Sequence, residues 1–195
     1  MKPHCLNDRE EELDVFFGII NRFIGYFTRD SIRHTGNDTT TEYPFVPMDT
    51  RQAYDQIKMA QGLVSVQKPT FIDVGCGIGN VLLMAELMDF QVYGIEKDAY
   101  PFKIAQKLMG DESVAQDDIW AFDRFDQFDV IYYFRPFSEK KLQHKFEKLM
   151  EEKLKPGGVL IANRKMNMDI DENPLFKRID EMLPVWVKVE RLEAL

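Results

Sequence analysis

The sequence has too few cysteines and histidines for a disulfide framework or a structural zinc site. Its 195 residues include two cysteines, Cys5 and Cys76, and three histidines. Cys76 stands between two glycines of a predicted loop, so we expect no structural disulfide and a reducing, cytoplasmic location. Structural zinc sites need four suitably spaced ligands, which these residues do not supply. We therefore expect no metal.

Long apolar runs and an excess of basic residues are also missing. No run approaches the ~18 apolar residues of a transmembrane helix, so we expect no membrane contact. The polar, acidic first residues do not resemble a secretory signal. The 25 basic residues are outnumbered by 33 acidic ones, giving a net charge of −8. This balance disfavours nucleic-acid binding, which depends on neutralising phosphates. The remaining composition, 45% hydrophobic and 30% charged, is typical of a soluble globular protein.

Residues 1–68 are predicted to form a helical segment that acts as a lid. Over 8–32, apolar residues recur at intervals of three and four, which predicts an amphipathic helix. Its aromatic face would pack on the core or mediate a homodimer. A loop rich in Gly, Asn, Thr and Pro follows at 34–47. A second helix is expected from a cap at Asp49 or Thr50 to about residue 66.

Residues 69–195 are predicted to form one α/β domain. Strands are expected at 70–74, 91–96, 113–118, 128–134, 157–165 and 185–192. Helices are expected at 80–88, 99–109, 138–154 and 173–182. This alternation predicts a doubly wound, mostly parallel sheet with helices on both faces and a ligand at the carboxyl ends of the strands. Because one clear strand follows the fifth, the sheet would lack its last strand or pair with a neighbouring chain.

The stretch FIDVGCGIGN combines a buried strand, a glycine loop and the start of a helix. Gly75 and Gly77 permit backbone conformations and a close ligand approach that a Cβ would prevent. Gly79 lets the following helix, which begins at Asn80, pack closely, and the free amides at that helix's N-terminus suit a polar ligand. We interpret Cys76 as a small filler of the loop rather than a nucleophile. The stretch predicts a nucleotide site, and we assign five of its residues to cofactor binding: Gly75, Cys76, Gly77, Gly79 and Asn80.

Two details distinguish between nucleotides. The dinucleotide fingerprint is G-x-G-x-x-G, and here the third glycine, Gly79, comes one residue early. Asp73 precedes the loop, and a carboxylate there repels a pyrophosphate but suits an ammonium group. No Gly-Lys-Ser/Thr follows, so the Walker pattern is absent. An NAD(P)-dependent oxidoreductase is therefore the less favoured alternative.

The segment DVGCGIG resembles the first motif, D/E-x-G-x-G-x-G, of the class I S-adenosylmethionine-dependent methyltransferases, and it matches every fixed position. The resemblance covers roughly Thr70 to Lys165 and includes the LKPGG turn. It implies a Rossmann-like methyltransferase fold, methyl-transfer activity and S-adenosyl-L-methionine as the cofactor. In this family the acidic residue, here Asp73, and the loop backbone hold the amino acid end of the cofactor.

Acidic residues that end the next two predicted strands strengthen the resemblance. Glu96 lies 21 residues after the first glycine, where an acid accepts the ribose hydroxyls. We assign Glu96 and the following Lys97 to the cofactor site. The resemblance implies that Asp117, or its neighbour Asp118, meets the adenine amino group and that Ile119 flanks the ring. Without the resemblance, the alternative interpretation is that Glu96 is a solvent-exposed residue at a strand end. The two aspartates would then belong to an ordinary turn.

The substrate side of this family follows the fourth strand, which here ends in FRPF. Amino-methyltransferases of DNA carry D/N/S-P-P-Y/F there. The polar first residue is missing, which disfavours an adenine or cytosine target. Arg135 would hold a carboxylate or phosphate of the substrate, or form a salt bridge at the rim. Tyr132 and Tyr133 point to opposite sheet faces. We assign Tyr132 to the cofactor site, and Tyr43, Tyr133 and Arg135 to the substrate.

The sequence leaves the methyl acceptor open. The stretch TEYPFVPMDT resembles the Y-V-P approach of small protein-lysine methyltransferases, in which case Tyr43, Phe45 and Tyr54 would close over the cofactor and form a lysine channel. Alternatively this loop only covers the sheet edge, and the acceptor is a small molecule. A sulfonium is a good leaving group, so alignment and desolvation supply much of the rate and no catalytic dyad is expected. A non-catalytic cofactor-binding module is a further alternative.

Overall fold

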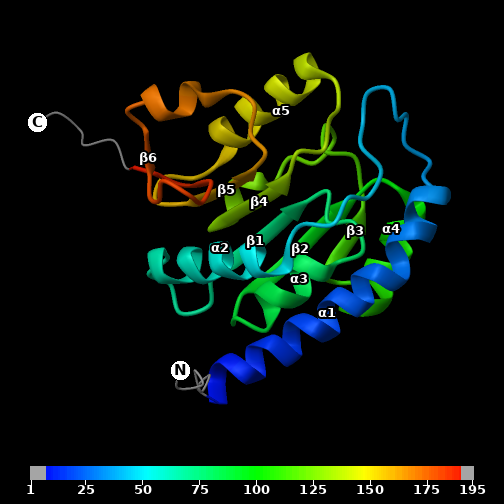
Figure 1. Ribbon diagram of the computed structural model, residues 1–195. Coiled ribbons are helices and arrows are strands. Elements are labelled where there is room, and N and C mark those ends of the chain that lie inside the picture. Colours follow the sequence, from blue (N-terminus) through cyan, green and yellow to red (C-terminus); the bar gives the residue numbers. More distant parts are fainter. Residues whose placement is uncertain (1–7, 190–195) are drawn as a thin grey trace, which may run out of the picture.

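The computed structural model describes residues 8–189 and has three layers, with helices on both faces of a seven-stranded sheet (Figure 1). The strand order is β3-β2-β1-β4-β5-β7-β6. Neighbours among β1 to β5 pair in parallel, whereas β7 is antiparallel to both β5 and β6. The predicted doubly wound, mostly parallel sheet is thus confirmed. The strands are β1 (Thr70–Val74), β2 (Gln91–Glu96), β3 (Val114–Gln116), β4 (Val130–Phe134), β5 (Val159–Asn163), β6 (Phe176–Arg178) and β7 (Val185–Lys188).

Two groups of helices cover the two faces of the sheet. One face packs against α2, α3 and α4, and the other against α5 and two short 3-10 turns. No helix within residues 8–189 is long and apolar enough to cross a bilayer. The helices and turns are α1 (Asp8–Arg33), α2 (Thr50–Leu63), α3 (Asn80–Glu86), α4 (Ala99–Met109), α5 (Lys140–Lys153), η1 (Phe125–Gln127) and η2 (Met168–Glu172).

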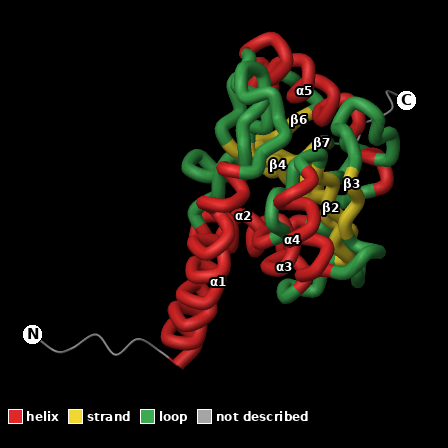
Figure 2. The backbone as a smooth tube through the Cα atoms, turned by 90° about the vertical axis from the view of Figure 1, so that its right-hand side faces the viewer, coloured by secondary structure: helices red, strands yellow, loops and turns green. Residues whose placement is uncertain are grey.

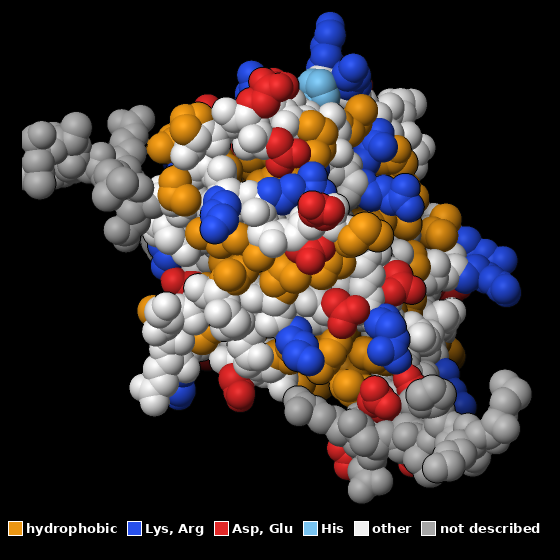
Figure 3. Space-filling view, turned by 60° about the vertical axis from the view of Figure 1, so that its left-hand side comes forward, with side chains coloured by type: hydrophobic (Ala, Val, Ile, Leu, Met, Phe, Trp, Pro, Cys, Tyr) orange, Lys and Arg blue, Asp and Glu red, His pale blue; other side chains and the backbone are white. Residues whose placement is uncertain are grey.

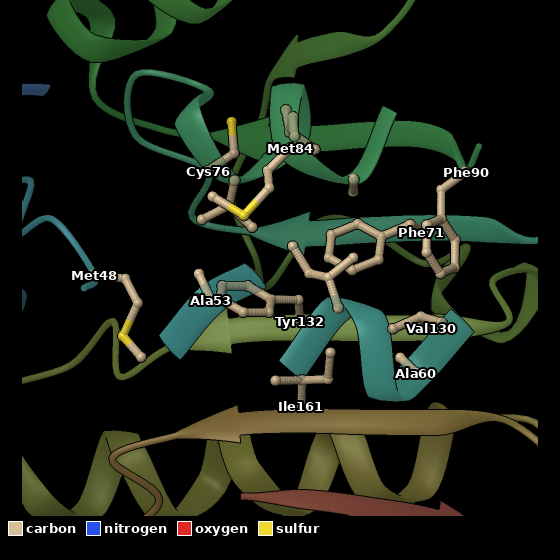
Figure 4. Packing of buried hydrophobic residues seen from close by; sticks show 14 of the residues in the cluster. Met48, Ala53, Ala60, Phe71, Cys76, Met84, Phe90, Val130, Tyr132 and Ile161 are labelled. Carbon is tan, nitrogen blue, oxygen red and sulfur yellow. The ribbon is translucent and has the colours of Figure 1, made fainter. Parts of the chain in front are cut away.

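The core on the α2–α3 side is built by alternation along the strands. Phe71 of β1 points into this cluster, whereas its neighbour Ile72 belongs to the cluster under α5, because successive strand residues point to opposite faces. The Phe71 ring lies 5.5 Å from that of Phe90 and 5.9 Å from that of Tyr132, measured between centroids (Figure 4). This apolar cluster packs one face of β1 and β4 against α2 and α3.

The predicted first helix is confirmed as α1, which extends beyond the sheet as a long arm (Figure 2). Its buried residues Ile20 and Ile24 pack with Ile78 of the glycine loop. Phe17 of the aromatic face is buried, and Phe16, Phe23 and Phe27 are partly buried against the same cluster, while Tyr26 is 76% exposed. The N-terminal helices pack on the rest of the chain. The division into a segment 1–68 and a domain 69–195 therefore stays a prediction.

The expected helix at 173–182 is wrong. The segment contains β6, which pairs with β7 through Phe176↔Lys188 and Arg178↔Trp186. The apolar spacing of the segment suits a helix, but the backbone groups of residues 176–178 instead pair with β7, the next strand of the chain. Strand pairing thus overrides the local pattern. The sheet therefore has seven strands within residues 8–189, which corrects the expectation of a missing last strand. Residues 190–192 of the expected final strand lie outside the described residues.

Candidate functional site

A cavity of about 400 Å³ opens at the carboxyl ends of β1, β2 and β4. Its size lies within the ~300–1,000 Å³ range of small-molecule sites. Parallel sheets bind their ligands at this edge, next to the strand where the chain order reverses, and here that strand is β1. The cavity lies between the glycine loop and the segment 34–48, which we call the strap.

Asp73 and Glu96 form an acidic floor. They end neighbouring strands and are 3% and 8% exposed. Burial, and then repulsion by Glu96, raises the pKa of Asp73 well above its usual range. Burial also raises the pKa of Glu96 to about 7, against the lowering effect of the backbone amides of Asp98, Gly77 and Lys97. Neither carboxylate has a cationic partner among residues 8–189. Bringing a cation into the cavity would therefore stabilise both anions.

Glu96 also holds the glycine loop in place. Its Oε2 accepts a hydrogen bond of 2.8 Å from the Gly77 amide, and its Oε1 accepts one of 2.8 Å from the Asp98 amide. The same carboxylate lines the cavity. Each carboxylate oxygen can accept a second hydrogen bond, so Glu96 is able to serve the loop and a ligand hydroxyl together.

The glycines have different tasks in the structure. Gly77 has a φ of +55°, and a Cβ there would collide with the ring of Phe45 from the strap. Gly75 has a φ of +79°, and its Cα faces open space in the cavity wall. Gly79, predicted to serve the cofactor, is not among the cavity-lining residues; a Cβ there would lie 3.3 Å from Ala105 of α4. Gly79 thus allows α3 and α4 to approach closely.

Three further predicted residues, from the glycine loop, α3 and β4, take distinct places. Asn80, the first residue of α3, is buried and lines the cavity. Cys76 also lines it, and burial raises the pKa of its thiol well above the usual range. Such a thiol is a poor nucleophile. The buried hydroxyl of Tyr132 has no hydrogen-bond partner among the described residues, although the side chain lines the cavity.

Tyr133 does not lie in the cavity. It is fully buried on the opposite face of the sheet, with its ring 4.9 Å from that of Phe146 in α5. The one-residue alternation along β4 separates it from Tyr132. The structure therefore gives no support to the assignment of Tyr133 to the substrate, and the residue belongs to the core. Tyr54, expected near the cofactor, packs on Phe17 of α1 instead.

The residues after β3 form the far wall of the cavity. Asp117, Asp118 and Ile119 all line it. The Asp118 carboxylate accepts a hydrogen bond of 2.8 Å from the Trp120 amide, which forms a tight turn. The Asp117 carboxylate accepts from the Asp118 amide at 2.8 Å. The turn that the sequence allowed is therefore present, and it presents both acids to the cavity.

The strap is fastened to the domain at both sides of the cavity. Its Tyr43 amide donates to the Pro136 carbonyl at 3.0 Å, just after β4. On the other side, Lys97 forms an ion pair of 2.7 Å with Glu42 of the strap. This hydrogen-bonded pair raises the pKa of Lys97. Lys97 thus anchors the strap in addition to lining the cavity.

Asp98 and Arg164 are among the cavity-lining residues that the sequence analysis did not identify. Asp98 accepts a hydrogen bond of 3.2 Å from the Gly36 amide and lines the cavity. Arg164, directly after β5, also lines it. The sequence could have indicated Arg164, because it directly follows a predicted strand, as Arg135 does. The carboxyl ends of neighbouring parallel strands lie at the same edge of the sheet, where ligands bind. Nothing in the sequence showed that Asp98 would face the strap.

We predict that Gly77→Ala weakens binding of S-adenosylmethionine by about tenfold or more. The new methyl group would meet the Phe45 ring and would also carry the penalty of about 1 kcal/mol for a positive φ. Gly157→Ala is the matched control, because Gly157 has a φ of +76° with open space around its Cα. Calorimetric titration of both variants should show the loss only at Gly77. Equal affinities would contradict the close contact between strap and loop.

The cavity fits the cofactor that the sequence implies. S-adenosylmethionine carries a sulfonium and an ammonium group, and the buried acids Asp73 and Glu96 lack a cationic partner among the described residues. The buried Tyr132 hydroxyl, which has no hydrogen-bond partner among the described residues, would be available for a further polar contact. Asp73 and the backbone of the glycine loop would hold the amino acid end, Glu96 the ribose, and Asp117 or Asp118 the adenine.

The chain is similar to one protein family and to several solved structures. A family model described as "Methyltransferase domain" matches residues 72–162. No curated protein sequence matches the chain significantly. The sugar N-methyltransferase KedS8 from Streptoalloteichus sp ATCC 53650 is 20% identical over 58% of this chain and 47% of its own, with a TM-score of 0.48. CalS10, an amino pentose methyltransferase from Micromonospora echinaspora, is 23% identical over 57% of this chain and 48% of its own, with a TM-score of 0.46.

These two solved structures extend well beyond the similarity, since the chain spans about half of their length. Identity at this level concerns the fold alone. The family match is more telling, because it begins within β1 and ends within β5, and so includes the glycine loop and both acidic strand ends. Residues 72–162, which extend from β1 to β5, thus match the family of methyltransferase domains.

Proposed function

We propose that the whole chain catalyses methyl transfer from S-adenosylmethionine to an acceptor that enters between the strap and the ends of β4 and β5. The observation that carries this proposal is the buried pair Asp73 and Glu96, which has no cationic partner among residues 8–189. When bound, the cofactor supplies an electrophilic methyl group: an acceptor lone pair forms the new bond to carbon, the S–C bond breaks with its electron pair left on sulfur, and the acceptor's proton passes to solvent.

The side chains of this protein contribute binding, orientation and exclusion of water. Phe45 lies against Gly77 and covers the loop. Tyr43 is held over the β4 end, with the Arg135 guanidinium 5.4 Å from its ring centroid. These contacts support the prediction that Tyr43 and Arg135 face the acceptor. Orientation and desolvation of this kind supply much of the rate when the leaving group is good.

Binding of the cofactor is tested by calorimetric titration with S-adenosylmethionine and, separately, NAD. We expect saturable binding of the first and none of the second. Asp73→Asn should weaken binding of S-adenosylmethionine by about tenfold or more, because the substitution removes the carboxylate that pairs with the ammonium group of the cofactor. Asp123→Asn, an exposed aspartate outside the cavity, is the control. Tight binding of NAD alone would overturn the proposal.

Turnover is tested with methyl-labelled cofactor over proteins, RNA and metabolites. Both a small molecule and a protein lysine are proposed acceptors at this stage, and a nucleic acid is less favoured. Basic and acidic side chains are interspersed on the face shown in Figure 3, without a broad basic area. Binding of the cofactor without labelling of any acceptor would favour the non-catalytic module. A cytoplasmic location and a homodimer stay proposals that this assay does not address.

A further inference from the structure

Two arginines stand side by side at the edge of the cavity that is farthest from β2. Arg135 directly follows β4 and Arg164 directly follows β5. The two strands are parallel neighbours with Phe134 opposite Asn163, and the Arg135 amide donates to the Asn163 carbonyl at 3.2 Å. Both arginines line the cavity. The residues that follow two adjacent strands are thus both arginines, and both line the same cavity.

Neither arginine has an anionic partner among residues 8–189. The Nε of Arg135 is buried and has no hydrogen-bond acceptor in the described part of the chain, and its guanidinium lies over the Tyr43 ring. Arg164 is exposed, and its φ of +54° shows that the backbone turns sharply there. A donor that is buried without an acceptor is costly unless a ligand supplies one.

The cavity is therefore divided by charge. Asp73 and Glu96 lie at the ends of β1 and β2, while the two arginines lie at the ends of β4 and β5. Glu42, which also lines the cavity, is paired with Lys97. The acids suit the cationic cofactor, and the arginines stand where the acceptor would enter. Planar guanidinium groups bind carboxylates and phosphates in a forked geometry.

We propose that the methyl acceptor is a small molecule with a carboxylate or phosphate group, which Arg135 and Arg164 bind beside the transferred methyl. This inference rests on the proposed function. The anionic group orients the acceptor, and a second, uncharged nucleophilic atom of the same molecule receives the methyl group. A carboxylate and a phosphate share the chemistry that the arginines recognise, and the experiment separates them.

The first test uses glutarate and inorganic phosphate as probes of the arginine pair. The protein, saturated with S-adenosylhomocysteine, is titrated with each, and the arginine Nε–H signals are followed by NMR. Wild type should bind at least one probe saturably. Arg135→Gln and Arg164→Gln should each weaken that binding about tenfold or more. Arg124→Gln, which removes an exposed charge before η1 and outside the cavity, should leave it unchanged.

A competing role for these arginines is to hold the carboxylate of the cofactor itself. In that case the two substitutions would weaken binding of S-adenosylhomocysteine, and the probes would compete with it. That result, or equal probe binding by wild type and both variants, would overturn the inference. Thermal unfolding of each variant establishes that it is folded, and Arg164→Gln is the safer substitution because Arg164 is exposed.

The second test identifies the charge of the product. Methyl-labelled S-adenosylmethionine is incubated with the protein and a metabolite extract, and labelled products are separated by anion exchange. We expect the anion-exchange column to retain the labelled product, and we expect a raised KM for the acceptor in both arginine variants. Loss of retention after phosphatase treatment indicates a phosphate group, and continued retention indicates a carboxylate. A neutral or cationic product with unchanged KM, or a labelled protein, contradicts the inference while leaving methyl transfer intact. Failure of the protein to bind S-adenosylmethionine contradicts the proposed function. In that case the titration with glutarate and phosphate, carried out without cofactor, still tests whether the two arginines bind anions.

Discussion

Glu96→Ala is expected to weaken binding of S-adenosylmethionine by about 1–3 kcal/mol, or roughly 5- to 150-fold. The carboxylate serves the ligand and the protein together, because it accepts hydrogen bonds from the amides of Gly77 and Asp98 while it lines the cavity. Its removal leaves both amides without an acceptor and frees the glycine loop. Calorimetry should show the lower affinity, and thermal unfolding should show a lower Tm before any ligand is added.

The protonation of Glu96 makes this effect depend on pH. Burial raises its pKa to about 7 in the folded protein, from 4.5. Because the folded state holds the proton more tightly than the unfolded state, this group contributes stability below about pH 4.5, and the contribution is lost as the pH rises to about 7. A cationic cofactor with donating hydroxyls favours the ionised carboxylate instead. The affinity should therefore rise several-fold from pH 6 to pH 8, in the direction of Glu96 ionisation.

Glu96→Gln separates these two contributions. The amide keeps one acceptor oxygen for the loop but has no proton to lose in this range. Its affinity should be lower than that of wild type at pH 8 and nearly constant between pH 6 and pH 8. A wild-type affinity in Glu96→Ala would remove this residue from the site. An unchanged pH profile in Glu96→Gln would assign the titration to another group, with Asp73 as the next candidate, since its pKa is also raised.

Glu147→Ala should lower the free energy of unfolding by about 3–5 kcal/mol. The carboxylate of Glu147 is fully buried in α5 and accepts hydrogen bonds from the amides of Met166 and Asn167 at 2.7 and 2.8 Å. Its other partners are Gln143, at 2.8 Å, and the ammonium of Lys165, at 3.3 Å. Lys165 is itself only 1% exposed. Truncation would leave a buried cation with Glu151 as its remaining ion-pair partner among the described residues.

Chemical denaturation checks this prediction, with Glu152→Ala as the control because Glu152 is an exposed carboxylate on the same helix. The control should change stability by less than about 0.5 kcal/mol. The double variant Glu147→Leu with Lys165→Met should regain much of the loss, since an apolar pair carries no desolvation penalty. The network also fixes the segment after Arg164, so probe binding at the arginine pair should weaken in Glu147→Ala. A loss below about 1 kcal/mol would mean that water reaches Lys165 and replaces the carboxylate.

The sequence by itself determined the local chemistry of the site. Glycines at 75 and 77 with positive φ, and acids at the ends of β1 and β2, follow from a spacing that the printed sequence shows directly. Such features depend on residues that are close in the sequence, so they can be predicted without knowledge of the fold. The helix cap at Asp49, which accepts from the Gln52 amide at 2.8 Å, is of the same kind.

Only the tertiary structure decided which of several equivalent residues enter the cavity. The sequence placed Tyr132 and Tyr133 on opposite faces of β4, but the packing of α5 under one face sends Tyr133 into the core. β6 exists because β7 offers it backbone partners, although its own apolar spacing suits a helix. The strap reaches the glycine loop through contacts between distant segments, such as Phe45 with Gly77. Long-range packing and strand pairing depend on which surfaces meet in space, and a linear pattern does not contain that information.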